Sequence, residues 1–376
     1  MIRTADVVVV GGGVIGCAVA RELARRGVRR VVVVERGGPG EEATRAAAGM
    51  VAPQAECDAP GPVLRLGLVS RARWSDWSAA LGEESGVDVH YRRDGIVYAA
   101  LSAADERVLG ARARWQRAAG LRVERIDAVA ARRLAPGLSP GLRSALFFPD
   151  DHRVDNERLG VAVARAAERA GATIVASTPV LAVRARRGRV RGVTTARGAI
   201  EAPIVVNAAG AWAAALRLPA GVVPPPVFPV RGQMLVLRPT TRVVARPVYS
   251  RRGYLVRRPD GRLLAGSTLE RVGYERRVTV EAVAWLLAAA QALVPALATA
   301  TLEGTYAGFR PGTPDRRPIL GPVPGLAGLF HATGHYRSGI LLAPATAEAI
   351  ADMILTGRTA LPLAGMDPGR FRRRRE

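Results

Sequence analysis

The chain has 376 residues, of which 49% are hydrophobic and 23% charged, a globular composition that excludes an extended disordered chain. Its 55 basic and 32 acidic residues give a net charge of +23, and every basic residue is an arginine. Either a basic surface attracts anionic partners, or a compositional bias places arginine where other proteins carry lysine. The scattered positions of the arginines favour the bias, and an anionic small-molecule ligand stays open.

The first elements in chain order predict a βαβ unit. Residues 6–10 form a continuous β-branched run, typical of a strand buried on both faces. A glycine turn leads into a predicted helix over residues 14–26, which stops at Gly27. A second buried strand is predicted at residues 31–34.

Three glycines and one acid inside this unit form a dinucleotide-binding fingerprint. Gly11 permits the tight turn, Gly13 lets the backbone approach a pyrophosphate, and Gly16 allows close packing of the helix on the strand. The phosphates would rest at the positive N-terminal end of the helix. Glu35 is placed to accept hydrogen bonds from ribose hydroxyls, which favours FAD or NAD over NADP.

Two further segments favour a flavin. Residues 46–53 are small, which lets the backbone pass close beside a large flat ring, and Thr44 is placed to bond a phosphate or ribityl group. Residues 205–212 predict a strand that runs into a second glycine turn. Together these segments favour FAD over NAD.

The middle and end of the chain predict a second unit interleaved with the first. Alternating residues at 233–237, 248–256 and 262–265 predict an antiparallel sheet, and residues 87–144 are expected to be helical with a short strand pair. The fold class is therefore α/β, a Rossmann-like FAD-binding domain interleaved with a substrate domain on an antiparallel β-sheet with helices. We expect an FAD-binding domain at 1–85, 146–222 and 316–366, a substrate-binding domain at 86–145 and 223–315, and a basic C-terminal tail at 367–376.

Two features bear on location and metals. Cys17 and Cys57 are too few for a disulfide framework or a cysteine-based zinc site, which suits a reducing cytoplasm, and we expect no metal. Residues 282–302 lack charge over a length that could span a bilayer. Pro295 interrupts this stretch, so it predicts a buried helix ending near Val294 and no stable membrane insertion.

The motifs resemble a known family. The sequence is similar to the D-amino-acid-oxidase-type FAD-dependent oxidoreductases, and within them to the glycine oxidases of thiamine biosynthesis. The resemblance covers nearly the whole chain and rests on the segments 11–16, 46–53, 229–233, 308–315 and 334–344. It implies noncovalent FAD, since covalent attachment in relatives needs a cysteine late in the chain.

The resemblance also implies the site residues. Arg310 would grip the substrate carboxylate bidentately, Tyr254 would donate to the same carboxylate, and Arg337 would approach flavin and substrate. His331 and His335 are expected to be hydrogen-bonded structural residues, because the flavin performs the chemistry and no base is compulsory. The implied cofactor-binding residues are Gly11, Gly13, Val14, Ile15, Gly16, Glu35, Arg36, Thr44, Ala47, Ala48, Gly49, Met50, Val180, Ala209, Gly210, Trp212, Gly334, His335, Tyr336, Arg337, Ser338, Gly339 and Ile340.

The implied activity is oxidative deamination of glycine or another small amino acid or amine, such as sarcosine or D-alanine. Hydride would pass to flavin N5, O2 would reoxidise the flavin to give H2O2, and the imine or glyoxylate product would serve thiamine thiazole synthesis. Two alternatives stay open: a D-amino-acid dehydrogenase that uses a quinone, and a flavoprotein that modifies an aminomethyl group in tRNA. No nucleic-acid partner is expected, and a homotetramer follows from the resemblance.

Overall fold

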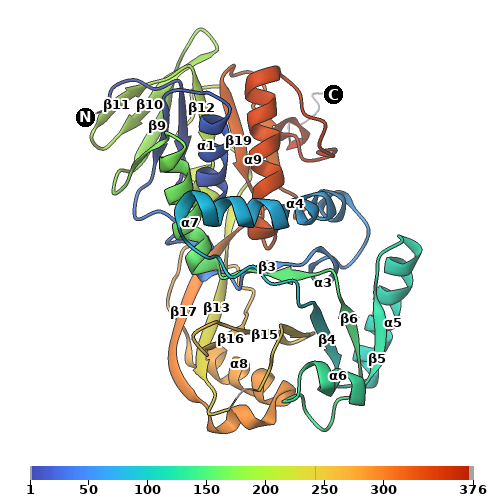
Figure 1. Ribbon diagram of the computed structural model, residues 1–376. Coiled ribbons are helices and arrows are strands. Elements are labelled where there is room, and N and C mark those ends of the chain that lie inside the picture. Colours follow the sequence, from blue (N-terminus) through green and yellow to red (C-terminus); the bar gives the residue numbers. More distant parts are fainter. Residues whose placement is uncertain (1, 242, 372–376) are drawn as a thin grey trace.

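The computed structural model describes residues 2–241 and 243–371. Its strands form two large sheets, one in the upper and one in the lower half of Figure 1. Segments from both ends and the middle of the chain contribute to the upper half, as the colours show. Most of the expected basic tail, residues 372–376, lies outside the described residues.

The upper sheet has six strands and carries the predicted βαβ unit. All neighbouring strands are parallel except the antiparallel edge pair β18–β19. In spatial order they are β18 (Ile319–Pro322), β19 (Leu329–Thr333), β12 (Ile204–Asn207), β1 (Val7–Val10), β2 (Val31–Val34) and β8 (Thr173–Val175).

Both faces of this sheet are covered, which explains its unbroken valine strands. Val7 and Val9 pack in one core with helices α1 (Val14–Arg25), α7 (Asn156–Arg169) and α9 (Gly339–Thr356). Val8 and Val10 pack in another core under a three-stranded antiparallel sheet. That sheet consists of β9 (Val180–Arg186), β10 (Arg189–Thr195) and β11 (Gly198–Glu201).

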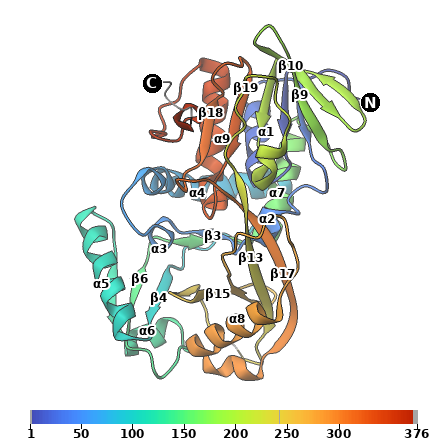
Figure 2. The ribbon, with the colours of Figure 1, turned by 180° about the vertical axis from the view of Figure 1, so that it is seen from behind.

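The lower sheet has eight strands and is antiparallel except where β14 pairs with β4. In spatial order they are β17 (Thr301–Gly312), β13 (Phe228–Arg238), β16 (Leu263–Gly266), β15 (Gly253–Arg257), β14 (Val248–Ser250), β4 (Ile96–Ala100), β6 (Ser144–Phe148) and β5 (Glu124–Asp127). The long pair β13–β17 reaches from this sheet toward the upper half in both ribbon views (Figures 1 and 2).

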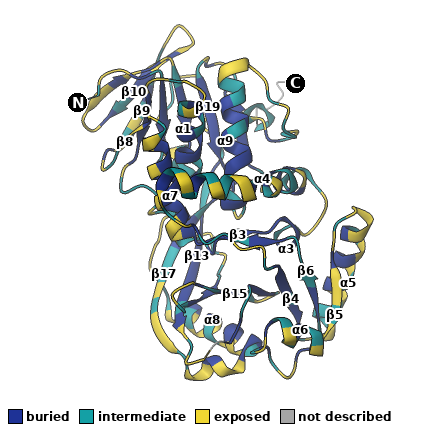
Figure 3. Ribbon diagram, viewed as in Figure 1, coloured by how far each residue is buried: buried dark blue, intermediate teal, exposed yellow. Residues whose placement is uncertain are grey.

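The remaining elements link or cover the two sheets. The strands β3 (Met50–Val51) and β7 (His152–Arg153) form a short pair between them. Figure 3 shows exposed faces on the outer helices and buried strands inside. The other helices are α2 (Ala43–Ala46), α3 (Pro53–Glu56), α4 (Pro62–Ser85), α5 (Ala103–Ala118), α6 (Ala128–Leu134) and α8 (Val280–Leu293), with 3-10 turns at Gly210–Ala215, Pro295–Thr299 and Pro368–Phe371.

One helix, α9, is long and apolar enough to cross a membrane by length and composition. Within the protein 61% of its residues are buried, since it packs on α1 and α4. The uncharged stretch at 282–302 begins with α8, which ends at Leu293, close to the predicted end, and is followed by a 3-10 turn. The helix is not fully buried as predicted, because only one of its faces packs on the sheet and Trp285 is exposed.

The expected fold class is confirmed. Residues 248–256 lie in this antiparallel sheet as expected, where they form the hairpin of β14 and β15 with a turn at Arg251 and Arg252. Residues 87–144 contain the helices α5 and α6 and the two strands β4 and β5, which both pair with β6 and not with each other. The expected domain boundary between 145 and 146 falls inside β6, so we propose the same interleaved division with this boundary placed after Phe148.

Candidate active site

The N-terminal end of α1 faces a cavity between the two sheets. Gly11 has φ +106°, and a Cβ there would overlap the carbonyl oxygen of Ala208. A Cβ at Gly16 would overlap the carbonyl oxygen of Gly11, so this glycine serves helix-to-strand packing. Gly13 is the helix N-cap and provides no side-chain cap, which leaves the helix end available to an anion.

An acidic residue marks one end of this cavity. Glu35 follows β2, is 8% exposed, and accepts hydrogen bonds from the backbone N–H groups of Gly12 (2.6 Å) and Gly37 (2.9 Å). These bonds fix the carboxylate while leaving further lone pairs for ribose hydroxyls. Beside it, the guanidinium of Arg36 lies 3.5 Å over the ring of Trp212 and walls the cavity.

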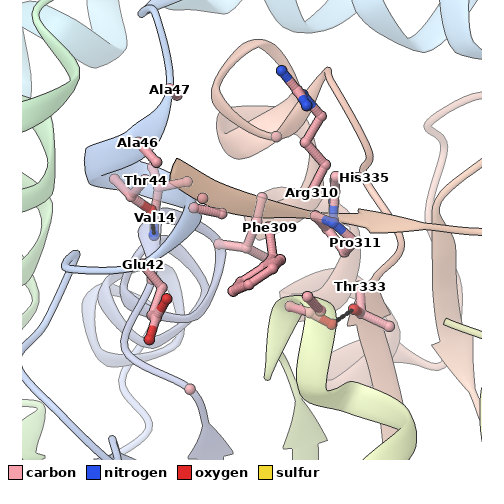
Figure 4. A pocket seen from close by; sticks show the side chains of 18 of the residues that line it. Val14, Glu42, Thr44, Ala46, Ala47, Phe309, Arg310, Pro311, Thr333 and His335 are labelled. Carbon is pink, nitrogen blue, oxygen red and sulfur yellow. Dashed lines mark hydrogen bonds between the residues drawn. The ribbon is translucent and has the colours of Figure 1, made fainter. Parts of the chain in front are cut away.

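A loop of small residues passes along the middle of the cavity. The Thr44 hydroxyl oxygen accepts a hydrogen bond from the N–H of Val14 at 3.0 Å and joins α2 to the start of α1, as Figure 4 shows. Its own hydroxyl hydrogen stays available to a ligand. Further along, a Cβ at Gly308 on β17 would overlap the Cβ of Ala46, so the loop passes directly against that strand.

The other end of the cavity is built around β17. Phe309 and Arg310 point to opposite sides of this strand (Figure 4). The Arg310 guanidinium donates to the carbonyl oxygen of Thr268 at 3.2 Å and to the hydroxyl oxygen of Ser267 at 2.5 Å. It lies over Gly232, where any Cβ would overlap it. Within residues 2–241 and 243–371, Arg310 has no carboxylate partner.

Tyr254 lies near Arg310 through the pairing of neighbouring strands. In strand β15, Tyr254 pairs with Gly266, the last residue of β16. The next residue, Ser267, carries the hydroxyl that Arg310 contacts. The Tyr254 hydroxyl donates to the Met234 sulfur at 3.4 Å, a weak bond that a stronger acceptor would replace. Tyr254 and Arg310 therefore line the same cavity.

Arg337, in the loop before α9, is paired with an acid that sequence reasoning missed. Its Nε lies 2.7 Å from the carboxylate of Glu56, and the Tyr249 hydroxyl donates to the same carboxylate at 2.5 Å. The negative charge of Glu56 raises the pKa of Arg337 further above its ordinary value. Glu56 is thus a fixed negative charge at the substrate end.

The two histidines lie close to α9 and differ. His335 is buried and its Nε2 is 3.0 Å from the Thr346 hydroxyl, consistent with a structural role; burial lowers its pKa to about 3. His331 was expected to be hydrogen-bonded, and this was wrong: neither ring nitrogen has a partner among the described residues. It lies beside Pro324 and Phe371, away from the cavity, and burial lowers its pKa to about 4.

The structure brings most of the implied site residues together around one cavity. Gly16, Gly334 and Ser338 do not line it; they belong to the helix and turn backbone behind it. The lining includes Gly11, Gly13, Val14, Ile15, Glu35, Arg36, Thr44, Ala47, Ala48, Gly49, Met50, Val180, Ala209, Gly210, Trp212, Tyr254, Arg310, His335, Tyr336, Arg337, Gly339 and Ile340. The described residues contain no group of three or more His, Cys, Asp or Glu side chains that could hold a metal ion.

Sequence reasoning missed Glu56 and Tyr249. They are 193 residues apart in the chain and meet only because β14 lies beside the segment that contains α3. The one available signal was the position of Glu56 three residues after the small segment 46–53, and an acid beside a small-residue run has no specific meaning by itself.

Comparison with known proteins defines the class. Residues 6–353 match the family described as FAD dependent oxidoreductase (DAO). The chain is 37% identical to a glycine oxidase from Pseudomonas aeruginosa, covering 94% of this chain and 95% of that one. It superimposes on the crystal structure of glycine oxidase from Geobacillus kaustophilus with a TM-score of 0.93 and 35% identity, covering 98% and 99% of the two chains.

A further relative is longer. The bifunctional protein ThiO/ThiG of Synechocystis sp. is 38% identical over 99% of this chain, which spans only 55% of that relative. The chain therefore belongs to the DAO family of FAD-dependent oxidoreductases. Within this family it is an FAD-dependent amino-acid oxidase.

The residues present fit FAD. An acid lies at one end of the cavity, the N-terminus of α1 with the glycine N-cap Gly13 follows, and a loop of small residues runs along the side. Thr44 keeps a hydroxyl donor toward this space. A Cβ at Gly308 would overlap Ala46, and a Cβ at Gly11 would overlap the Ala208 carbonyl oxygen. These two glycines therefore let neighbouring segments of the cavity wall pack in direct contact.

Proposed function

We propose that the protein oxidises glycine or another small amino acid or amine, such as sarcosine or D-alanine, and that O2 reoxidises the flavin to H2O2. One observation carries this proposal. The guanidinium of Arg310 borders the cavity and, among the described residues, donates hydrogen bonds only to the Thr268 carbonyl and the Ser267 hydroxyl. A planar cation that is free of any acid partner suits a single substrate carboxylate.

The neighbouring side chains support one bound carboxylate. Tyr254 supplies a hydroxyl that now bonds only to a thioether and can turn to the substrate. The charge of Arg337 is compensated by Glu56, so the substrate end keeps one uncompensated cation, Arg310, within the described chain. This balance matches a substrate with one carboxylate and an amine that is neutral when it reacts.

Bound FAD would supply the chemistry, since its N5 accepts the hydride from the α-carbon. The protein's part is to bind and orient. Arg310 and Tyr254 would hold the carboxylate, and the N-terminal end of α9 with the preceding loop would stabilise negative charge on bound flavin. His335 stays neutral and bonded to Thr346, so it holds the loop and transfers no proton.

The overall reaction converts glycine, O2 and water to glyoxylate, ammonia and H2O2 through an imine. We further propose that the imine or glyoxylate serves thiazole formation in thiamine synthesis, in the cytoplasm. The support is the similarity to the ThiO/ThiG protein, which covers 99% of this chain and 55% of that relative, and to glycine oxidases. A homo-oligomer, most simply a tetramer, is part of this proposal.

Oxygen consumption tests the function. The FAD-loaded protein is supplied with glycine, sarcosine, D-alanine and D-proline while oxygen and peroxide are followed. We expect oxygen uptake with matching peroxide on glycine or sarcosine. Reduction of an artificial electron acceptor without oxygen uptake would replace the oxidase with a quinone-linked dehydrogenase. Tight, salt-sensitive tRNA binding would instead favour the nucleic-acid alternative.

A further inference from the structure

A buried arginine lies behind the loop that lines the cofactor cavity. Arg258 follows β15 directly, is 4% exposed, and among the described residues forms no ion pair with a carboxylate. It donates to the side-chain oxygen of Asn156 and to the carbonyl oxygens of Val154 (3.4 Å) and Ala47 (3.5 Å). Burial lowers its pKa from the ordinary value. Burial of a guanidinium without a carboxylate partner costs free energy, which its hydrogen bonds must offset.

Asn156 connects Arg258 to the loop by hydrogen bonds. It is fully buried at the start of α7, and its amide nitrogen donates to the carbonyl oxygens of Thr44 (2.8 Å) and Arg45 (2.7 Å). These carbonyls belong to the short helix α2, whose last turn leaves carbonyl groups without intrahelical partners. Asn156 therefore supplies hydrogen-bond donors to the backbone carbonyl groups of the helix on which Thr44 lies.

The far end of the loop is fixed to the same support. The N–H of Val154 donates to the carbonyl oxygen of Gly49 at 2.8 Å. A Cβ at Gly49 would overlap the Val154 carbonyl oxygen and come within 3.4 Å of Arg258, and its φ is +83°. The loop residues 44–50 are thus held along their length from the side opposite the cavity that they line.

We propose that Arg258 and Asn156 form a clamp that holds residues 44–50 in the shape that binds FAD, so that the clamp sets FAD affinity. Most residues of the loop have small side chains and few side-chain hydrogen-bond donors. The position of its backbone therefore decides how well the loop fits the cofactor. A loop held in the bound shape avoids the entropy of ordering it on binding. Both are positioning residues, since they act through the loop.

The test measures FAD binding directly and does not depend on substrate. Apoprotein is titrated with FAD, and the quenching of flavin fluorescence gives the dissociation constant. Arg258→Met should weaken FAD binding by at least about tenfold, because it removes charge-assisted hydrogen bonds to the loop and to Asn156. Arg262→Met is the matched control: Arg262 lies four residues on, bonds to Asp260 at 2.7 Å, and should leave FAD affinity unchanged.

A second variant separates the clamp from simple charge compensation. Asn156→Asp would give Arg258 a carboxylate partner but would remove both N–H donors to Thr44 and Arg45. The clamp predicts weaker FAD binding in Asn156→Asp, with its apoprotein still folded by circular dichroism. Tighter or unchanged FAD binding would overturn the clamp, as would unchanged affinity in folded Arg258→Met. If Arg258→Met does not fold, Asn156→Asp decides alone.

Discussion

The Nε of Arg337 lies 2.7 Å from Oε2 of Glu56, so the substrate end of the cavity contains a compensated pair beside the uncompensated Arg310. The side chain of Glu56 is only 9% exposed, and Tyr249 donates to its other oxygen. This pair lies away from bulk solvent, where charges interact more strongly than at the surface.

Glu56→Gln is therefore expected to raise the affinity of the holoprotein for acetate. The variant keeps the size of the side chain, but it leaves the charge of Arg337 uncompensated, so an added anion should bind about tenfold tighter at low salt. The measurement is the change in the flavin absorption spectrum on titration with acetate. The control Glu303→Gln removes an exposed partner of Arg238 and should change nothing. Equal acetate affinity in Glu56→Gln and wild type would disprove this reading of the pair.

Arg310→Ala should lose recognition of the carboxylate while keeping the flavin. Loss of a bidentate charged contact predicts a rise of about a hundredfold or more in KM for glycine. Steady-state kinetics measures KM, and the visible spectrum of the purified variant reports bound FAD. If the variant is purified without flavin at normal stability, Arg310 belongs to the cofactor site and the assignment is wrong.

Gly232→Ala should displace the side chain of Arg310. A Cβ at Gly232 would overlap the Arg310 guanidinium, so we expect a higher KM for glycine with FAD content unchanged. Gly304→Ala on β17 is a matched control, because a Cβ there meets nothing within 4 Å. Both KM values are measured side by side. Equal values in the two variants would show that the position of Arg310 does not depend on Gly232.

Asp151 predicts a pH-dependent stability. It is fully buried, accepts from the N–H of Ala55 at 2.7 Å, and lies 3.1 Å from Arg71. Burial raises its pKa to about 7, although Arg71 and the backbone donors oppose the rise. A raised carboxyl pKa means that the folded protein holds the proton more tightly than the unfolded chain, so stability is lost as the pH rises toward the folded pKa.

Wild type should therefore lose stability relative to Asp151→Asn between about pH 4 and about pH 7, by about 4 kcal/mol at most. Thermal unfolding of both proteins across this range measures the difference. A constant difference in unfolding temperature would show that Asp151 is ionised throughout.

The nucleotide-binding half could be predicted because its signals are local. Strand β1, the turn at Gly11 and helix α1 follow each other within 25 residues, and each forms for a reason visible in its own residues. Arg310 was identifiable only through the motif around it. Every basic residue of this chain is an arginine, so an arginine by itself does not indicate a binding site.

The rest of the site depends on contacts between distant segments. Glu56 and Tyr249 meet across two elements far apart in the chain, and neither lies in a motif with a defined chemistry. Arg258 has no sequence feature that separates it from the half-buried Arg262 four residues later; only full burial against the loop distinguishes it.

The most direct test of the central claim is anaerobic mixing of the FAD-loaded protein with glycine while the visible absorbance of oxidised flavin is followed. The proposed function predicts that this band disappears, at a rate that saturates with glycine concentration, and that it returns with stoichiometric peroxide when O2 is admitted. Flavin that stays oxidised with glycine, sarcosine and D-alanine, in protein with full FAD content, would contradict it.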